Sequence, residues 1–107
     1  AMGDRRRLAL LLLNIGVAHD VADRPAEALK AYDEARIIFE DLGQDFDAAR
    51  TDVDRALALL NLDKLEEAEA AYLSALDVFL HHGQELEVAR VSLNLGLLHA
   101  RSGRFAA

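Results

Sequence analysis

The sequence predicts an all-α fold, a solenoid of antiparallel helix pairs, from its composition, an internal repeat and the spacing of its small residues. The 107-residue chain has no Cys or Trp, only one Pro, and an apolar content made up mainly of Leu, Ala, Val and Ile. This mixture favours helix, and no run of alternating β-branched residues indicates a strand. A chain of this length fits one small domain, which we expect to span residues 4–107 after a cloning remnant at 1–3.

The repeat has a period of 40 residues. Shifting the chain by 40 places "LGQDFDAAR" (42–50) on "HGQELEVAR" (82–90), and both copies end in Arg. Shifting it by 80 places "LNIGVAH" (13–19) on "LNLGLLH" (93–99), whereas the middle copy, "VDRALAL" (53–59), is more divergent. The chain therefore contains two full units and the opening of a third, at about 8–47, 48–87 and 88–107.

Each unit is predicted to form two helices. Ala28, Ala31, Tyr32, Ala35 and Phe39 recur at three- and four-residue steps, as do their counterparts 40 residues later, and this spacing marks one face of a helix. The small residues Gly16, Ala56 and Gly96 share one position of the repeat, where they would let neighbouring helices approach closely. The expected helices are 5–22, 24–42, 45–62, 64–82 and 85–101.

Residues at the turns support these boundaries. Gly43 and Gly83 stand where a left-handed C-terminal cap favours glycine. Asp23 and Asp63 are expected to cap the starts of the second helices, Asp63 with Glu66 at capping-box spacing. Pro25 falls in the first helical turn, where its missing N–H costs little.

Charge and composition narrow the functional classes. The net charge of −7 repels phosphate backbones, so we expect no nucleic-acid partner. The absence of Cys rules out disulfides and thiolate metal sites and is compatible with the cytoplasm. The excess of Arg over Lys hints at a GC-rich bacterial genome. The start "RRRLALLLLNIGVA" (5–18) imitates a secretory signal peptide, but we favour a buried helix, and the apolar run is too short to cross a membrane.

At these residues the chain resembles the tetratricopeptide repeat family. The matching positions are Gly16, His19, Asp23, Pro25, Ala28, Tyr32 and Ala35 in unit one, Ala56, Leu59, Asp63, Leu65, Ala68, Tyr72 and Ala75 in unit two, and Gly96, His99, Gly103 and Phe105 in unit three. The period of 40 instead of 34 is similar to that of kinesin light chains and of bacterial regulatory arrays, whose units are joined by segments like "DLGQDFDAAR" (41–50). The resemblance implies a right-handed solenoid whose first helices line a concave groove that binds partner proteins.

Helical spacing indicates which side chains would face this groove. The predicted peptide-binding residues are Asn14, Val17, Arg50, Asp54, Leu57, Asn61, Arg90, Asn94, Leu97 and Arg101, with Leu10, Leu13, Asp20, Val53 and Leu93 on the same faces. An Asn amide can both donate to and accept from a peptide backbone, and an Arg fork can bind a carboxylate with two bonds. We therefore predict a groove for an extended or helical peptide that carries acidic groups. In the alternative, Arg50 and Arg90 only pair with Asp47, Asp54 or Glu87.

The pattern predicts neither catalysis nor a cofactor. His19 and His99 are expected to pack between helices, and His81 and His82 to complement the negative end of a helix. No spacing typical of a metal site, a phosphate loop or a nucleophile elbow is present. Ser92, Leu95, Gly96 and His99 would pack on a further helix, and the run Leu8–Leu13 is almost wholly apolar. We therefore expect a homo-oligomer through a terminal helix, or a regulatory segment of a larger signalling or transcription-regulator protein, beside the peptide-binding scaffold.

Overall fold

The computed structural model describes residues 2–103, so the predicted family position Phe105 lies outside the described residues. The described chain forms five helices: α1 Met2–Val21, α2 Pro25–Asp41, α3 Asp45–Asn61, α4 Leu65–His81 and α5 Glu85–Ser102. These match the predicted boundaries to within three residues, and α1 begins before the expected residue 5. Each helix packs on the next one along the chain. The prediction of an all-α solenoid is confirmed.

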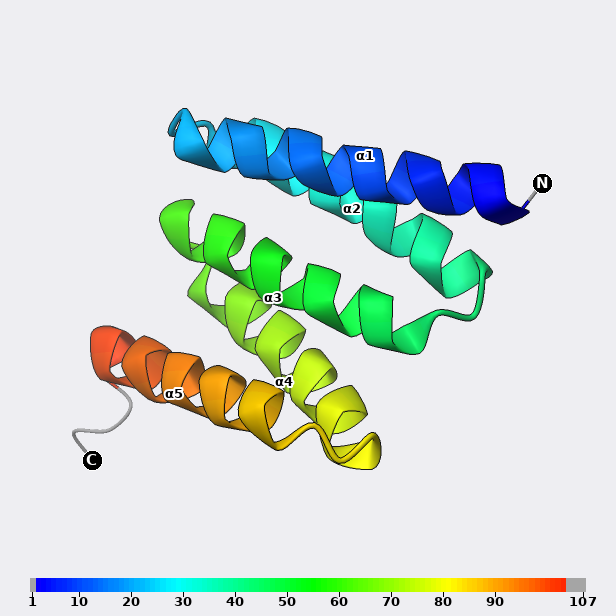
Figure 1. Ribbon diagram of the computed structural model, residues 1–107. Coiled ribbons are helices and arrows are strands. Elements are labelled where there is room, and N and C mark those ends of the chain that lie inside the picture. Colours follow the sequence, from blue (N-terminus) through cyan, green and yellow to red (C-terminus); the bar gives the residue numbers. More distant parts are fainter. Residues whose placement is uncertain (1, 104–107) are drawn as a thin grey trace.

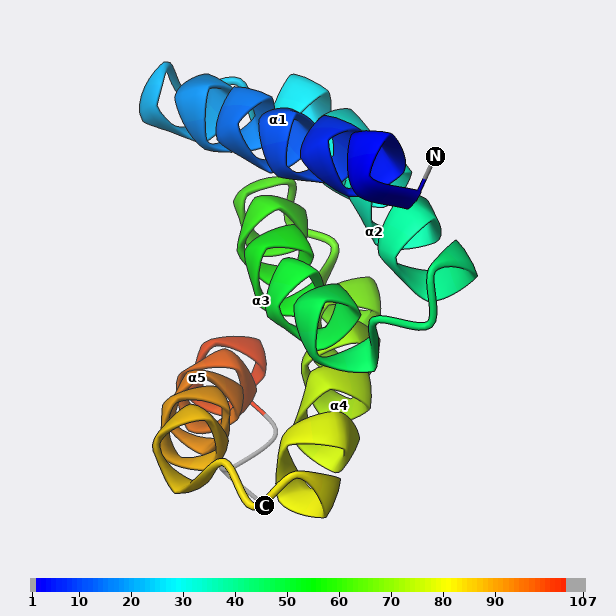
Figure 2. The same ribbon diagram turned by 45° about the vertical axis from the view of Figure 1, so that its right-hand side comes forward.

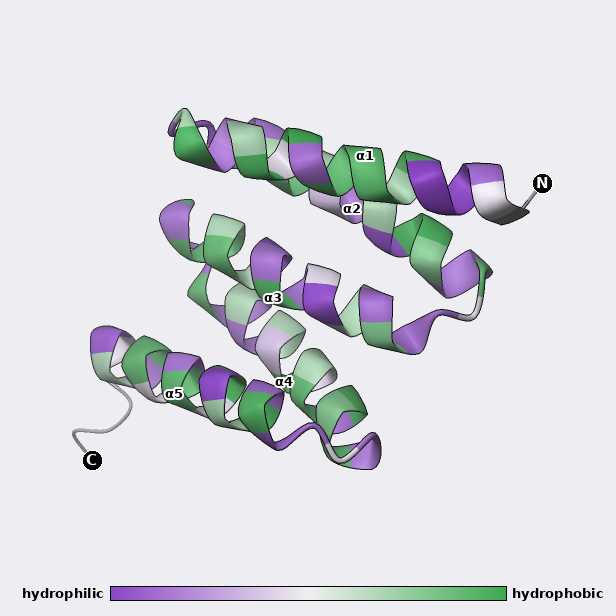
Figure 3. Ribbon diagram, in the orientation of Figure 1, coloured by the Kyte–Doolittle hydropathy of each residue, from purple (hydrophilic) through white to green (hydrophobic). Residues whose placement is uncertain are grey.

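The helices form two layers. In Figure 1, α1, α3 and α5 lie one above another in front, and α2 and α4 lie behind them. Hydrophobic and hydrophilic residues alternate along each helix in Figure 3, as expected for helices with one buried face. The first helices of the units therefore share one side of the molecule, and the second helices share the other.

The turns repeat more regularly than the sequence suggested. Asp23, Gly43, Asp63, Gly83 and Gly103 all have positive φ, so a left-handed residue occurs every 20 residues. The prediction is confirmed for the glycines and wrong for Asp23 and Asp63, which end the preceding helices instead of capping the next ones. The residues that precede α2 and α4 are Arg24 and Lys64, and neither helix has a side-chain cap. Asp can adopt this conformation because its short polar side chain bonds locally.

The tyrosines of the second helices fill the space beside the small residues of the first helices. Tyr32 and Tyr72 are fully buried, as are Gly16 and Ala56. A Cβ atom added to Gly16 would lie 2.4 Å from Cε1 of Tyr32, which explains why glycine is needed there. Ala9 of the N-terminal apolar run is buried against α2, consistent with a packed helix, whereas Leu8 and Leu11 remain about half exposed.

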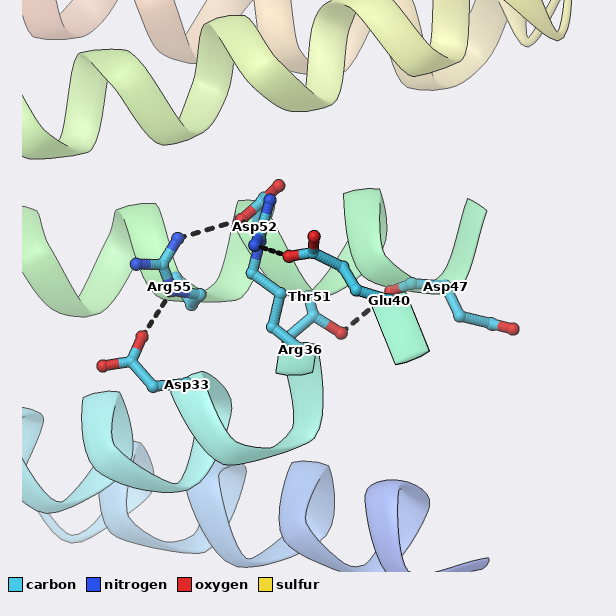
Figure 4. Close-up of polar contacts among 7 residues, drawn as sticks. All are labelled: Asp33, Arg36, Glu40, Asp47, Thr51, Asp52 and Arg55. Carbon is cyan, nitrogen blue, oxygen red and sulfur yellow. Dashed lines mark hydrogen bonds and ion pairs between the residues drawn. The ribbon is translucent and has the colours of Figure 1, made fainter. Parts of the chain in front are cut away.

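The joint between α2 and α3 contains a buried network of charges that was not predicted from the sequence (Figure 4). The side chain of Asp52 is 3% exposed and accepts from Arg36 Nε at 2.5 Å and from Arg55 at 2.9 Å. Arg55 also bonds Asp33 at 2.6 Å, and Arg36 bonds Glu40. The α2–α3 joint is thus held by ion pairs at its centre.

The equivalent joint between α4 and α5 is apolar except for one histidine–carboxylate contact. Val91 and Leu95 of α5 are buried in one cluster with Tyr72 of α4. His99 Nε2 lies 2.5 Å from Glu69 Oε2, so this histidine has a carboxylate partner on α4. The expectation that Leu95 and His99 await a further helix is therefore wrong, because both already pack on the preceding unit.

Candidate functional site

A hollow of about 470 Å³ lies between the three first helices. It is lined by Leu10 and Leu13 from α1, Asp47, Arg50, Thr51, Val53 and Asp54 from α3, and Glu87, Arg90, Val91, Leu93 and Asn94 from α5. The helical repeat places Arg50 and Arg90 at the same position on adjacent units, so both guanidinium groups reach one hollow. The leucines and valines form its apolar part.

The two arginines have little internal competition. Within residues 2–103, Arg50 has no ion pair within 4.0 Å, and Arg90 has only a contact of 4.0 Å with Glu87, one turn earlier on the same helix. Asp47, which could have neutralised Arg50, is instead bonded to Arg6 at 2.7 Å. In the alternative interpretation, both arginines are neutralised by their neighbours. Among the described residues, only Arg90 has such a neighbour, Glu87, at the long distance of 4.0 Å.

Asp54 is the acidic group of the hollow with the most perturbed pKa. Burial and the charge of Asp20 on α1 raise the pKa of Asp54 to about 6, although the nearby charge of Arg50 lowers it. Asp20 itself accepts a hydrogen bond of 2.6 Å from the hydroxyl of Tyr32. Near neutral pH, a fraction of Asp54 is thus protonated, and its carboxyl group can then donate as well as accept.

A smaller hollow of about 170 Å³ continues along α5. Asn94 lines both hollows, and Leu57, Leu97 and Arg101 line the smaller one. Arg101 lies 3.7 Å from Asp63, and the side chain of Arg101 is half exposed. The amide of Asn94 is therefore placed between the arginines of the larger hollow and the leucines of the smaller one.

The structure does not bring all predicted residues together. Asn14, Val17 and Asn61 are exposed but line neither hollow. From the sequence, Asp47 and Glu87 were expected only as partners of the arginines, whereas both line the larger hollow. Their position three residues before each Arg, on the same helical face, was the signal that could have identified them.

In residues 2–103 we find no group of three His, Asp or Glu side chains able to hold a metal ion. No helix in the same range is long and apolar enough to cross a membrane.

Among three comparisons with known proteins, only the one with solved structures found a similar protein. No protein-family model matches the chain, and no curated protein matches it. Among solved structures it is similar to the Rap conjugation gene regulator of the plasmid pLS20, in complex with the Phr* peptide, with a TM-score of 0.82 and 25% identity. The chain has the fold of a tetratricopeptide-like helical repeat. The similarity covers 92% of this chain but only 27% of that regulator, so the chain spans about a quarter of the regulator's length.

Proposed function

We propose that the chain is a non-enzymatic scaffold that binds an acidic partner peptide in the hollow between α1, α3 and α5. The observation that carries this proposal is that Arg50 and Arg90 line one hollow and that, within residues 2–103, the contact of 4.0 Å between Arg90 and Glu87 is the only ion pair of either arginine. A guanidinium group binds a carboxylate with two parallel bonds. Two such groups on adjacent units suit a peptide with acidic groups along its length.

The remaining lining residues suit the rest of a peptide. The Asn94 amide, between the two hollows, can pair with a backbone peptide group whatever the side chain. Leu10, Leu13 and Leu93 provide an apolar surface for side chains of the partner. Asn14, Val17 and Asn61 would contact only a longer peptide that extends beyond the two hollows.

The similar regulator supports a peptide partner, since its structure is that of a complex with the Phr* peptide. The 40-residue period further suggests the long-period subgroup of tetratricopeptide repeats. We also propose a cytoplasmic location, where such a partner would be available.

The experiment is a selection of random heptapeptides against the chain, followed by calorimetric titration of the selected peptides. We expect acidic sequences, and we expect Arg50→Ala/Arg90→Ala to weaken binding by about tenfold or more, because each lost charge-assisted bond costs on the order of 1 kcal/mol. Replacing Glu by Gln in the peptide should have a similar effect.

The control variant is Arg24→Ala/Lys64→Ala. It removes the same charge at two equivalent positions one unit apart, and neither residue lines the hollow. If the groove variant and the control bind the peptides equally well, the two arginines do not form the site. If no acidic peptide is selected, the proposed partner chemistry is wrong.

A second candidate is a regulatory or oligomerising segment of a larger protein. It is favoured by the fact that the chain matches only 27% of a much longer gene regulator. Light scattering on a sizing column tests self-association: a monomer at high protein concentration would exclude the oligomer. The groove titration distinguishes the two candidates, because only the first requires Arg50 and Arg90.

A further inference from the structure

Arg50 and Arg90 occupy the same position of the repeat, but the residues one helical turn beyond them differ. Asp54 follows Arg50 by four residues on α3, and Asn94 follows Arg90 by four residues on α5. Residues four apart share a helical face, and all four side chains line the larger hollow. One arginine therefore has a carboxyl group beside it, whereas the other has an amide, which does not ionise.

Asp54 also lies near a second carboxyl group, that of Asp20 on α1. In Figures 1 and 2, α3 lies between α1 and α5. Oδ2 of Asp20 accepts a hydrogen bond of 2.6 Å from Tyr32, whereas its Oδ1 is buried and has no hydrogen-bond partner among the described residues. The charge of Asp20 is thus only partly compensated, and a second negative charge beside it is disfavoured. Burial and this charge together raise the pKa of Asp54 to about 6.

All five helices contribute charged or titratable groups to the surroundings of Asp54. They are Asp20 from α1, Tyr32 from α2, Asp47 and Arg50 from α3, Tyr72 from α4, and Glu87 and Arg90 from α5. The pKa values of both tyrosines are raised, so their hydroxyl groups keep their protons at neutral pH. Among the described residues that line the larger hollow, Asp54 is the carboxyl group whose pKa is raised toward neutral pH.

We propose that Asp54 makes the binding of an acidic ligand in the larger hollow pH-dependent, because its charge controls whether Arg50 is available to the ligand. This inference rests on the proposed function and names the regulation of the same site. An ionised Asp54 attracts the guanidinium group of Arg50 and repels an approaching carboxylate. A protonated Asp54 does neither, so Arg50 can then bind the carboxylate. Arg90, beside Asn94, binds its carboxylate irrespective of this proton.

Ligand binding and proton uptake are linked through Asp54. A bound carboxylate adds a further negative charge near Asp54 and so raises its pKa again. The affinity for an acidic ligand therefore increases as the pH falls through the range in which Asp54 gains its proton, and binding is accompanied by proton uptake. Glutamate side chains of the ligand keep their charge in this range, since they gain a proton only near pH 4.3, roughly.

The test is calorimetric titration of the full chain with a blocked hexapeptide of glutamate at pH 5.5 and pH 7.5. We expect binding to be about fivefold tighter at pH 5.5, which is the order of effect of one neighbouring charge. At pH 6.5, titrations in two buffers with different ionisation enthalpies should give different binding enthalpies, and the difference measures the proton uptake.

Asp54→Asn gives α3 the same pair of Arg and Asn that α5 already has. This variant should bind the hexapeptide at both pH values about as tightly as the parent chain does at pH 5.5, without proton uptake. It retains all four histidines, so any pH dependence that it still shows comes from other groups.

Two further variants separate the role of Asp54 from a general effect of charge. Asp47→Asn removes the same charge from the same hollow, where Asp47 is bonded to Arg6 at 2.7 Å, and it should leave the ratio of the two affinities unchanged. Asp20→Asn keeps an acceptor for Tyr32 but removes the charge that acts on Asp54, so it should move the pH dependence to lower pH. Circular dichroism checks that each variant folds.

The outcomes distinguish this inference from the proposed function. Equal affinity of the parent chain at both pH values, or tighter binding at pH 7.5, would overturn the inference alone. The same holds if Asp54→Asn retains the full pH dependence. Absence of binding at both pH values, or equal binding by Arg50→Ala/Arg90→Ala, would overturn the proposed function and this inference with it.

Discussion

Asp52 provides the sharpest test of how the two units are joined. Its carboxylate is 3% exposed and accepts from Arg36 at 2.5 Å and from Arg55 at 2.9 Å. Replacing one member of a buried ion pair typically costs about 3–5 kcal/mol, since the partner charge is left without compensation. Here the side chains of Arg36 and Arg55 are 28% and 24% exposed and retain Glu40 and Asp33 as partners. We therefore expect Asp52→Ala to cost about 2–3 kcal/mol.

Asp33→Ala is the comparison variant. Its side chain is 45% exposed, so its ion pair with Arg55 should contribute only about 0–1 kcal/mol. Urea unfolding, followed by circular dichroism, measures both changes. For a chain of this size, the loss at Asp52 should also lower the melting temperature by on the order of 10 °C or more.

The same chain supplies an uncharged replacement for the network. At the α4–α5 joint, the positions of Arg36, Asp52 and Arg55 are taken by Leu76, Ser92 and Leu95. Because buried ion pairs can often be replaced by apolar residues at little cost, Arg36→Leu/Asp52→Ser/Arg55→Leu should recover most of the stability lost in Asp52→Ala. The reasoning is refuted if Asp52→Ala and Asp33→Ala are equally stable, or if the triple variant is less stable than Asp52→Ala.

Further outcomes follow from the site and the turns. The pKa of Asp54 is raised from 3.8 to about 6, so the folded state binds an extra proton between these values and loses stability as the pH rises through them; Asp54→Asn should flatten this dependence in urea titrations and increase stability at neutral pH. Gly16→Ala should cost about 1–3 kcal/mol by collision with Tyr32, whereas Gly96→Ala should be neutral or stabilise by up to about 1 kcal/mol, as thermal melts can show. Asp63→Gly should stabilise by up to about 1 kcal/mol, because its φ is +60; lower stability in the same melts would mean that its side chain has another role.

The turns show where sequence reasoning reached its limit. Gly43 and Asp63 occupy the same left-handed position, but only the glycine was recognised. Asp is one of the commonest residues at helix N-termini, so its position next to Pro25 or Glu66 favoured a cap. The 20-residue recurrence of positive φ shows that backbone geometry, not residue type, is the conserved feature of these turns.

The candidate site was predictable as far as helical spacing determines it. Residues four apart share a face, so Arg90 and Asn94 were placed on one stripe from the sequence, and both line the same hollow. The extent of the hollow was not predictable, because Asn14 and Asn61 fall on the same stripes but beyond its ends. Where a groove deepens depends on the angles between helices.

The sequence by itself determined the helices, their period and the faces that each presents, because these depend on residues a few positions apart. Tertiary structure alone decided which of these faces meet. Asp52 forms an ion pair with Arg36 on another helix, and the pKa of Asp54 is raised by burial together with the charge of Asp20. Such contacts depend on how helices cross, and neither composition nor spacing specifies that angle.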